Sequence, residues 1–277
     1  MVISAPAAHE LEARRRLSHL LGPRDQLALE DNPYEHSRGD VLACPALALA
    51  VWMDRALADA VILRRPDHHI MLHSRDGGPL REMPEGARGL AHSEGIRRQL
   101  AAAQPGVHWR REGDLEAALQ EVLDGSAACL AAPLGLIEDD ALPGRPIPAR
   151  ACLHQPLCGI WMVVGEPDDV APLKELDDPR TRICLRAEHA ALVGLIAGLA
   201  RSQAAGDPLD LLDDPPVGID CSILGAQHVL RGVVPPADGA DAPPVRREVV
   251  TETNVPPEEA GAQLAEELLD AAGYAWW

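Results

Sequence analysis

The sequence contains no phenylalanine, and aromatic residues make up 3% of its 277 positions. The hydrophobic core must therefore be built from leucine, valine, isoleucine and alanine. Hydrophobic residues make up 47% of the chain and charged residues 25%, which is typical of a globular protein, while 25 prolines and 23 glycines predict many loops. At this length we expect two or three domains.

The chain also lacks paired cysteines. Its six cysteines are scattered and none belongs to a CxxC pair, so neither a disulfide framework nor a thiolate zinc site is predicted. His69 and His73 have the i, i+4 spacing of two metal ligands on a helix, but the apolar residues between them are typical of a strand, in which that geometry is lost. We therefore expect no metal and treat the cysteines as reduced thiols.

Basic residues are scarce. The chain has 25 Lys plus Arg against 43 Asp plus Glu, a formal charge of -18, and such a surface repels a phosphate backbone. The longest apolar runs fall short of the roughly 20 residues that span a membrane, and no basic region precedes an apolar one at the N-terminus. We expect a cytoplasmic protein that binds neither nucleic acid nor a membrane.

In the middle of the chain, helices and strands alternate. A helix is predicted from about Ser93 to Gln104, followed by a short strand over 107–109, a helix capped by Asp114 and an apolar strand over 127–132. Alternation at this spacing predicts a parallel sheet with helical crossovers.

The remaining elements are predicted from apolar patterns and from helix-ending residues. They are a helix over 10–21, a strand over 157–165, a helix after 177–182, a strand over 247–253 and a helix over 256–273. The apolar stretch over 41–63 is interpreted as a strand or helix start, a helix over 51–60 and a strand over 61–63, although the period alone does not settle this order. A proline-rich loop leads to Cys221. The acidic pairs Asp139–Asp140 and Asp213–Asp214 are interpreted as solvated loop charges.

Several segments carry a resemblance to a known family. HSEGIRRQL, AACLAAPLGL, HQPLCGIWM, DPRTRICLRAEHAAL, GIDCSILGAQ and AGAQLAEELLDAAG follow one another in the chain. In this order they resemble the porphobilinogen deaminase family, also called hydroxymethylbilane synthases, over roughly 39–273. Each segment is degenerate, but their order is specific.

The resemblance implies an α/β fold of three domains. The first two resemble the halves of a periplasmic binding protein with a cleft between them, and the third is a small α+β domain. Mapped onto this sequence, a truncated first domain covers 1–84 with 154–176, the second covers 85–153, and the third, with Cys221, covers 177–277.

The resemblance also implies a chemistry. Family members join porphobilinogen molecules head to tail with loss of ammonia, on a dipyrromethane cofactor held through a thioether by a cysteine that would here be Cys221. Arginine forks suit the acetate and propionate groups of the pyrroles, and Arg97 and Arg98 match the family's paired arginines. Ser93 and Gln155 stand in matching motifs and are assigned to substrate binding.

The sequence departs from the family pattern at several positions. Glu112 and Ala118 stand where the family has two arginines. An alignment without gaps places Leu47 on the family's lysine and Ala48 on its catalytic aspartate, and a competing alignment of this region also loses an arginine. Asp40, Asp54 and Glu112 could replace the missing acid by chemistry alone.

Alternative hypotheses follow for Cys221 and for the whole chain. Cys221 is either a covalent attachment point or a small buried thiol, since free cysteine is among the most buried residue types. The leading hypothesis is a hydroxymethylbilane synthase-like transferase with altered activity. The alternative is a non-catalytic ligand-binding or partner protein that kept the fold and lost the catalytic acid, and a third, weaker option is an unrelated two-domain α/β ligand-binding protein. Under the leading hypothesis, the partner is a pyrrole or a similar carboxylate-bearing small molecule. The sequence does not predict an oligomeric state.

Overall fold

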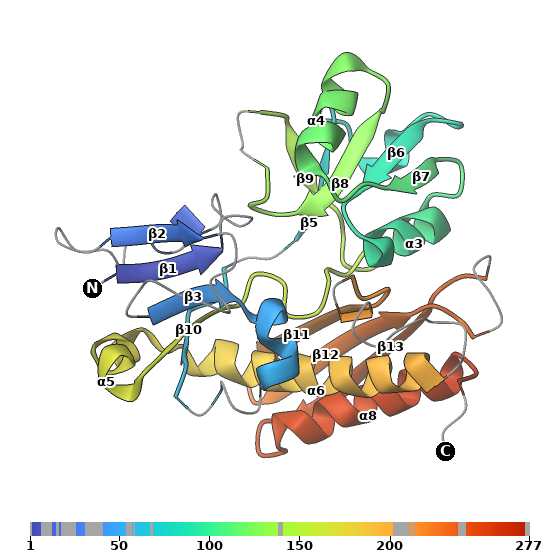
Figure 1. The fold of residues 1–277 in the computed structure, drawn as a ribbon. Helices are drawn as coiled ribbons and strands as arrows, with labels where there is room; N and C mark the ends of the chain where they lie inside the picture. Colours follow the sequence, from blue (N-terminus) through green and yellow to red (C-terminus); the bar gives the residue numbers. More distant parts are fainter. Residues whose placement is uncertain are drawn as a thin grey trace. The chain divides into compact units, whose positions relative to one another are not determined.

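The computed structural model has a mixed α/β fold with three sheets (Figure 1). The residues that it describes are 2–6, 13, 14, 17, 26–30, 41–53, 57, 59–66, 69–137, 141–201, 211, 212, 214–237 and 242–274. The chain divides into two compact units, Met1–Pro66 with Leu157–Leu185 and Asp67–Pro156 with Arg186–Trp277. We call these unit 1 and unit 2. The division into three domains stays a prediction.

Unit 1 holds a five-stranded sheet in the order β2-β1-β3-β10-β4. The strands are β1 (Val2–Pro6), β2 (Gln26–Glu30), β3 (Val41–Pro45), β4 (Val61–Ile62) and β10 (Trp161–Gly165). β1 runs parallel to β2 and β3, whereas β10 runs antiparallel to β3 and β4. The undecided stretch 41–63 is thus a strand, a 3-10 helix η2 (Ala46–Trp52) and a second strand.

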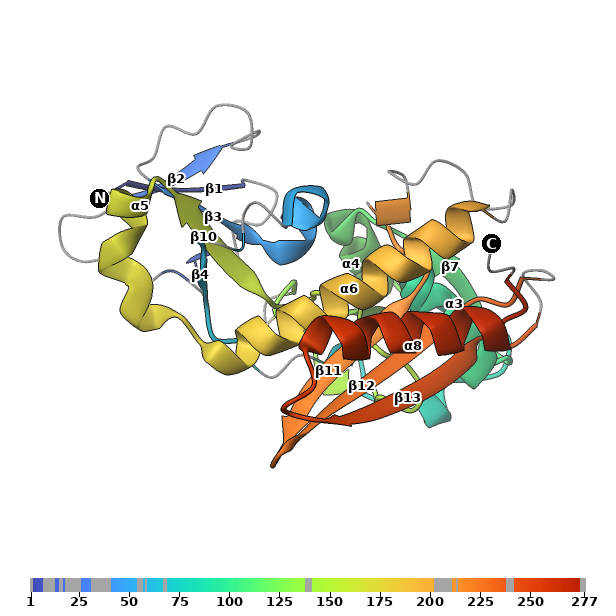
Figure 2. The same cartoon turned by 90° about the horizontal axis from the view of Figure 1, so that it is seen from below.

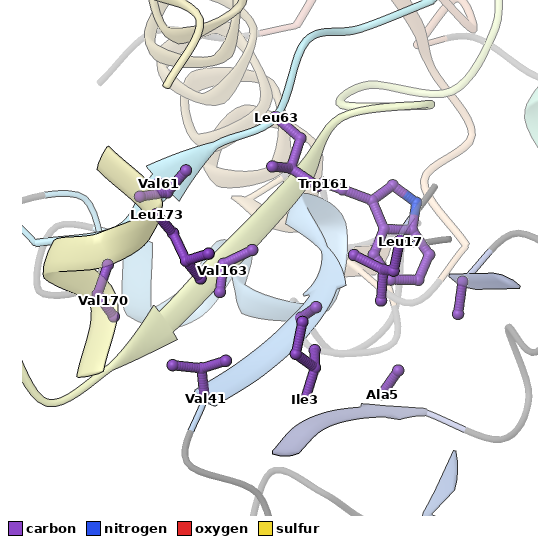
Figure 3. Packing of buried hydrophobic residues seen from close by; sticks show 12 residues of the cluster. Ile3, Ala5, Leu17, Val41, Val61, Leu63, Trp161, Val163, Val170 and Leu173 are labelled. Carbon is purple, nitrogen blue, oxygen red and sulfur yellow. The ribbon is translucent and has the colours of Figure 1, made fainter. Parts of the chain in front are cut away.

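Among the described residues of its core cluster, unit 1 has one large aromatic side chain, Trp161. Trp161 is 1% exposed. Figure 3 shows it among aliphatic side chains, with Val170 from α5 (Pro167–Val170) and Leu173 from η4 (Ala171–Leu176). This confirms the expectation of a core built from leucine, valine, isoleucine and alanine.

The DPRTR segment joins the sheet of unit 1 to the start of α6 (Pro179–Arg201). Asp177 accepts a hydrogen bond from Ile62 N at 2.8 Å and is bound by the Arg182 guanidinium at 2.5 Å. Asp178 accepts the N–H of Thr181 at 2.7 Å, as a helix cap does. The segment therefore has a structural role within this unit.

Unit 2 contains the predicted crossover sheet, in the order β7-β6-β8-β5-β9. Its elements are β5 (Ile70–His73), η3 (Leu80–Glu82), β6 (Arg88–Ala91), α3 (Glu94–Ala103), β7 (His108–Arg111), α4 (Leu115–Asp124), β8 (Cys129–Pro133) and β9 (Gly144–Pro146). β6 is parallel to β7 and β8, as expected, but β5 pairs antiparallel with β8 and β9. Leu90 packs with residues of α4 and Ala91 with residues of α3, so the two helices cover opposite faces.

The second sheet of unit 2 is wholly antiparallel and consists of β11 (Gly218–Leu224), β12 (Gln227–Val234) and β13 (Val245–Glu252). α8 (Pro257–Ala271) contacts β12 and β13 and runs beside α6 (Figure 2). A Cβ added to Gly261 would come within 2.2 Å of Ala187 O, so glycine allows this close approach. The proline-rich segment before Cys221 leads into strand β11, which carries Cys221 and which the apolar pattern did not predict.

Candidate functional site

The predicted arginine pair lies on α3 and is held by a carboxylate of the same helix. Arg97 donates to Glu94 from Nε and Nη2, both at 2.7 Å, and Arg98 Nε donates to Glu94 Oε1 at 2.6 Å. Burial alone would raise the pKa of Glu94, but the hydrogen bonds from both arginines outweigh it and the net shift is downward. The hydrogen bond with Glu94 raises the pKa of Arg97.

Both arginines also line a pocket of about 320 Å³ in unit 2. Its other lining residues are alanines and prolines, namely Ala101, Ala102, Pro105, Pro235, Pro236, Ala242, Pro243 and Pro244. Among the described residues that line this pocket, the charged ones are Arg97 and Arg98. We call it the arginine pocket.

Ser93 and Gln155 have structural partners at the start of α3. Ser93 is the N-cap, and its Oγ accepts the N–H of Ile96 at 3.3 Å. Gln155 Nε2 donates to Asp214 Oδ1 at 3.2 Å. The structure brings these two residues to the same helix end, but their assignment to substrate binding stays a prediction.

Asp214 places a carboxylate at that helix end, which the sequence did not indicate. Besides the Gln155 amide, it accepts the N–H of Glu94 at 3.3 and 3.2 Å and binds Arg111 Nε at 2.5 Å. Its side chain is 20% exposed. The interpretation of Asp214 as a solvated loop charge is therefore wrong.

Cys221 lies in the middle of β11 and is 2% exposed. It pairs with Leu230 of β12, and its backbone N–H donates to Glu188 Oε1 of α6 at 2.9 Å. Its neighbours Asp220 and Ser222 line a second pocket of unit 2, of about 250 Å³. Because side chains alternate along a strand, the thiol points to the opposite, buried face.

This second pocket, which we call the strand pocket, contains a polar network. His154 Nε2 lies 3.3 Å from Asp220 Oδ1, and Arg231 Nη1 lies 3.3 Å from Asp220 Oδ2. Arg231 also binds Glu248 at 2.7 Å. Cys152 lines the pocket as well, and burial raises the pKa of its thiol to about 12 although Arg246 lowers it, so the group is a thiol at neutral pH.

Gln99 holds the chain segment that carries His154 and Gln155. Its amide donates to Leu153 O at 2.9 Å and accepts from Leu153 N at 2.8 Å. It directly follows the arginine pair in the sequence, and the motif IRRQ was the one signal that could have drawn attention to it.

Comparisons with known proteins decide the family. The porphobilinogen deaminase of Roseiflexus castenholzii is 30% identical over 228 residues, which cover 78% of this chain and 68% of that protein. The chain belongs to the porphobilinogen deaminase family. The enzyme of Nocardia farcinica is 33% identical over 222 residues, covering 76% of this chain and 61% of that protein. No family model matches the chain.

Solved structures resemble the chain weakly. A periplasmic substrate-binding protein of an ABC transporter from Coxiella burnetii is 14% identical with a TM-score of 0.35, covering 68% of this chain and 92% of that one. A score this low supports no statement about function.

The positions at which this member departs from the family pattern have local roles. Glu112 Oε2 lies 3.3 Å from Arg110 Nη1, and Ala118 is buried in α4. Leu47 and Ala48 lie in η2, whose seven residues include no acid. Asp40 and Asp54 lie outside the described residues.

The remaining candidates have simple explanations. His73 lies in strand β5 with Nδ1 3.2 Å from Leu142 O, so the helical spacing of His69 and His73 does not arise.

Within the described part of the chain, one helix, α6, is long and apolar enough to cross a membrane by length and composition. Core helices of soluble proteins pass the same test, and 56% of its apolar window is buried.

Proposed function

We propose that this family member binds a pyrrole or a similar small molecule bearing carboxylates, and that Arg97 and Arg98 receive a carboxylate of that ligand. The observation that carries the proposal is the arginine pocket, in which two guanidinium groups stand among alanine and proline side chains. Apolar walls accommodate a ring, while arginine forks fix a carboxylate.

Glu94 competes for the same guanidinium groups without saturating them. A guanidinium has five N–H donors, and Arg97 gives two of its nitrogens to Glu94 while Arg98 gives one. A ligand carboxylate can therefore bind the remaining donors, or displace Glu94 from one of the arginines.

Calorimetric titration with porphobilinogen tests this proposal. Substituting both arginines, Arg97→Met with Arg98→Met, should weaken binding about 10-fold or more, because charge-assisted hydrogen bonds contribute about 1.5–3 kcal/mol. The exposed Arg150 gives the matched control, Arg150→Met. Equal affinity in the double variant and the control would show that the arginine pocket is not the binding site.

The dipyrromethane cofactor of the family does not fit the described conformation of Cys221. The thiol is 2% exposed and points away from the strand pocket, so a thioether would require it to leave its buried face. The buried thiol, the absence of the family's acid and the loss of two of its arginines at Glu112 and Ala118 support the second hypothesis, binding without catalysis.

Two measurements distinguish a transferase with an attached cofactor from a non-catalytic binding protein. An attached cofactor would add the mass of about two pyrrole units to wild type and nothing to Cys221→Ser, whereas the non-catalytic version predicts no adduct in either. Incubation with porphobilinogen would release ammonia only from the transferase. We expect neither an adduct nor ammonia, with binding retained in Cys221→Ser.

A further inference from the structure

We propose that His154, Glu188 and Asp220 form a binding site for a divalent transition metal of the Zn²⁺ type. One ligand atom from each residue lies within 4.8 Å of the other two. The three come from separate segments: the stretch after β9, helix α6 and strand β11. The fold of unit 2 therefore brings them together, and no sequence motif indicates them.

The geometry of the closest pair fits a shared metal. Ligands at about 2.1 Å from a tetrahedral zinc ion stand about 3.4 Å apart, and His154 Nε2 lies 3.3 Å from Asp220 Oδ1. Glu188, within 4.8 Å, needs a side-chain shift of about an ångström to complete the set.

The tautomer of His154 supports the same conclusion. Its Nδ1 lies 2.7 Å from Gln155 O, and a carbonyl oxygen can only accept, so Nδ1 carries the proton. In the neutral ring, Nε2 then directs its lone pair at the Asp220 carboxylate. A metal ion, or a proton shared between Nε2 and the carboxylate, would make that contact favourable.

Each of the three side chains also has an outer partner of the kind that orients metal ligands. Gln155 O accepts from the other ring nitrogen of His154, Arg231 binds the second oxygen of Asp220 at 3.3 Å, and Cys221 N donates to Glu188 at 2.9 Å. Metal-binding histidines commonly donate their other N–H to a backbone carbonyl, and ligating carboxylates are in turn hydrogen-bonded.

Burial and charge favour a doubly charged occupant. Glu188 is fully buried and the side chain of Asp220 is 14% exposed, and a buried carboxylate needs a counter-charge or strong hydrogen bonds. Arg231 contacts Asp220 at 3.3 Å and Glu248 at 2.7 Å. A divalent ion would balance both buried carboxylates.

The strand pocket supplies a path to the site, because His154 and Asp220 are among its lining residues. Three protein ligands leave a coordination position open for water or for a ligand group. One imidazole with two carboxylates favours zinc over magnesium, which prefers oxygen ligands. The inference stands without the proposed function, since it requires neither the arginine pocket nor the Cys221 thiol.

Zinc uptake by the full chain tests the site. Chelator-treated wild type should take up one equivalent of Zn²⁺ in equilibrium dialysis followed by elemental analysis, and should gain thermal stability with Zn²⁺ but not with Mg²⁺. His154→Gln and Asp220→Asn should each weaken zinc affinity by about 100-fold or more, because losing even an outer partner costs 10–100-fold.

His108→Gln is the matched control, since His108 is exposed on β7 outside the cluster, and it should bind zinc as wild type does. Circular dichroism of the two ligand variants checks that they remain folded. Equal zinc affinity in wild type and both folded ligand variants would place the metal elsewhere, for example on a cysteine, and overturn the proposal. No uptake by wild type would also overturn it, leaving an imidazolium–carboxylate ion pair.

Discussion

The two crossover helices of unit 2 begin in different ways, although each has ten residues and follows a parallel strand. The N-terminus of α4 is satisfied locally, because Asp114 accepts the N–H groups of Glu116 and Ala117 at 3.0 and 3.1 Å. α3 combines its own cap, Ser93, with Asp214, which comes from 120 residues further along the chain.

This difference shows how a helix end can hold a distant segment in place. The Asp114 cap is exposed and stabilises α4 alone. Asp214 joins α3, Arg111 and Gln155 to the segment that leads into β11 and Cys221. Glycine at position 95 permits the contact, since a Cβ there would come within 2.9 Å of Pro215 O.

Among these substitutions, removing the carboxylate of Asp214 should change the free energy of unfolding most. Asp214→Ala should lower the free energy of unfolding by about 1–3 kcal/mol, because the Glu94 N–H and the Gln155 amide lose an acceptor in a partly buried site. The exposed Arg111 contributes little of this. Urea denaturation measures the loss as a lower midpoint at an unchanged slope.

Acetate at millimolar concentration sharpens this test. It should partly restore the stability of Asp214→Ala, measured against chloride at equal ionic strength, because a small carboxylate can occupy the position that the side chain left. Stability equal to that of wild type in Asp214→Ala would show that the remote carboxylate adds nothing to α3.

The same contrast explains what the sequence could predict. Ser93, Asp114 and the apolar periods of α3, α4 and α8 fix these helices locally, and all were predicted close to their observed bounds. Strands β11 and β12 were missed because Cys221 follows a proline-rich loop and its neighbours interrupt the apolar pattern. Asp214, Gln99 and the cluster of His154, Glu188 and Asp220 depend on pairings between distant segments, which local patterns do not encode.

Removing the local cap should have a smaller effect. Asp114→Ala should lower the free energy of unfolding by about 1 kcal/mol, the usual effect of losing an N-cap side chain. Acetate should not restore it, because water already reaches the exposed end of α4. Urea denaturation of Asp114→Ala and Asp214→Ala, with and without acetate, checks both statements. If acetate restores the stability of both variants equally, the N-termini of α3 and α4 do not differ in the way described.

The smallest change in the free energy of unfolding is expected from the ion pairs of Glu94 within α3. Helix α4 has no such pairs, because the residues three and four positions after its first-turn Glu116 are Leu119 and Gln120. The folded state lowers the pKa of Glu94 from its ordinary value of 4.5. Its contribution to stability is therefore present above that value and is lost as the pH falls through the folded pKa. Pairs of this spacing contribute about 0.2–0.5 kcal/mol each.

Glu94→Gln should thus be slightly less stable than wild type at neutral pH, and the two curves of stability against pH should converge in acid. Adding Arg97→Met and Arg98→Met to Glu94→Gln should leave this pH profile unchanged. If the triple variant and Glu94→Gln differ in their dependence of stability on pH, another carboxylate forms ion pairs with Arg97 and Arg98.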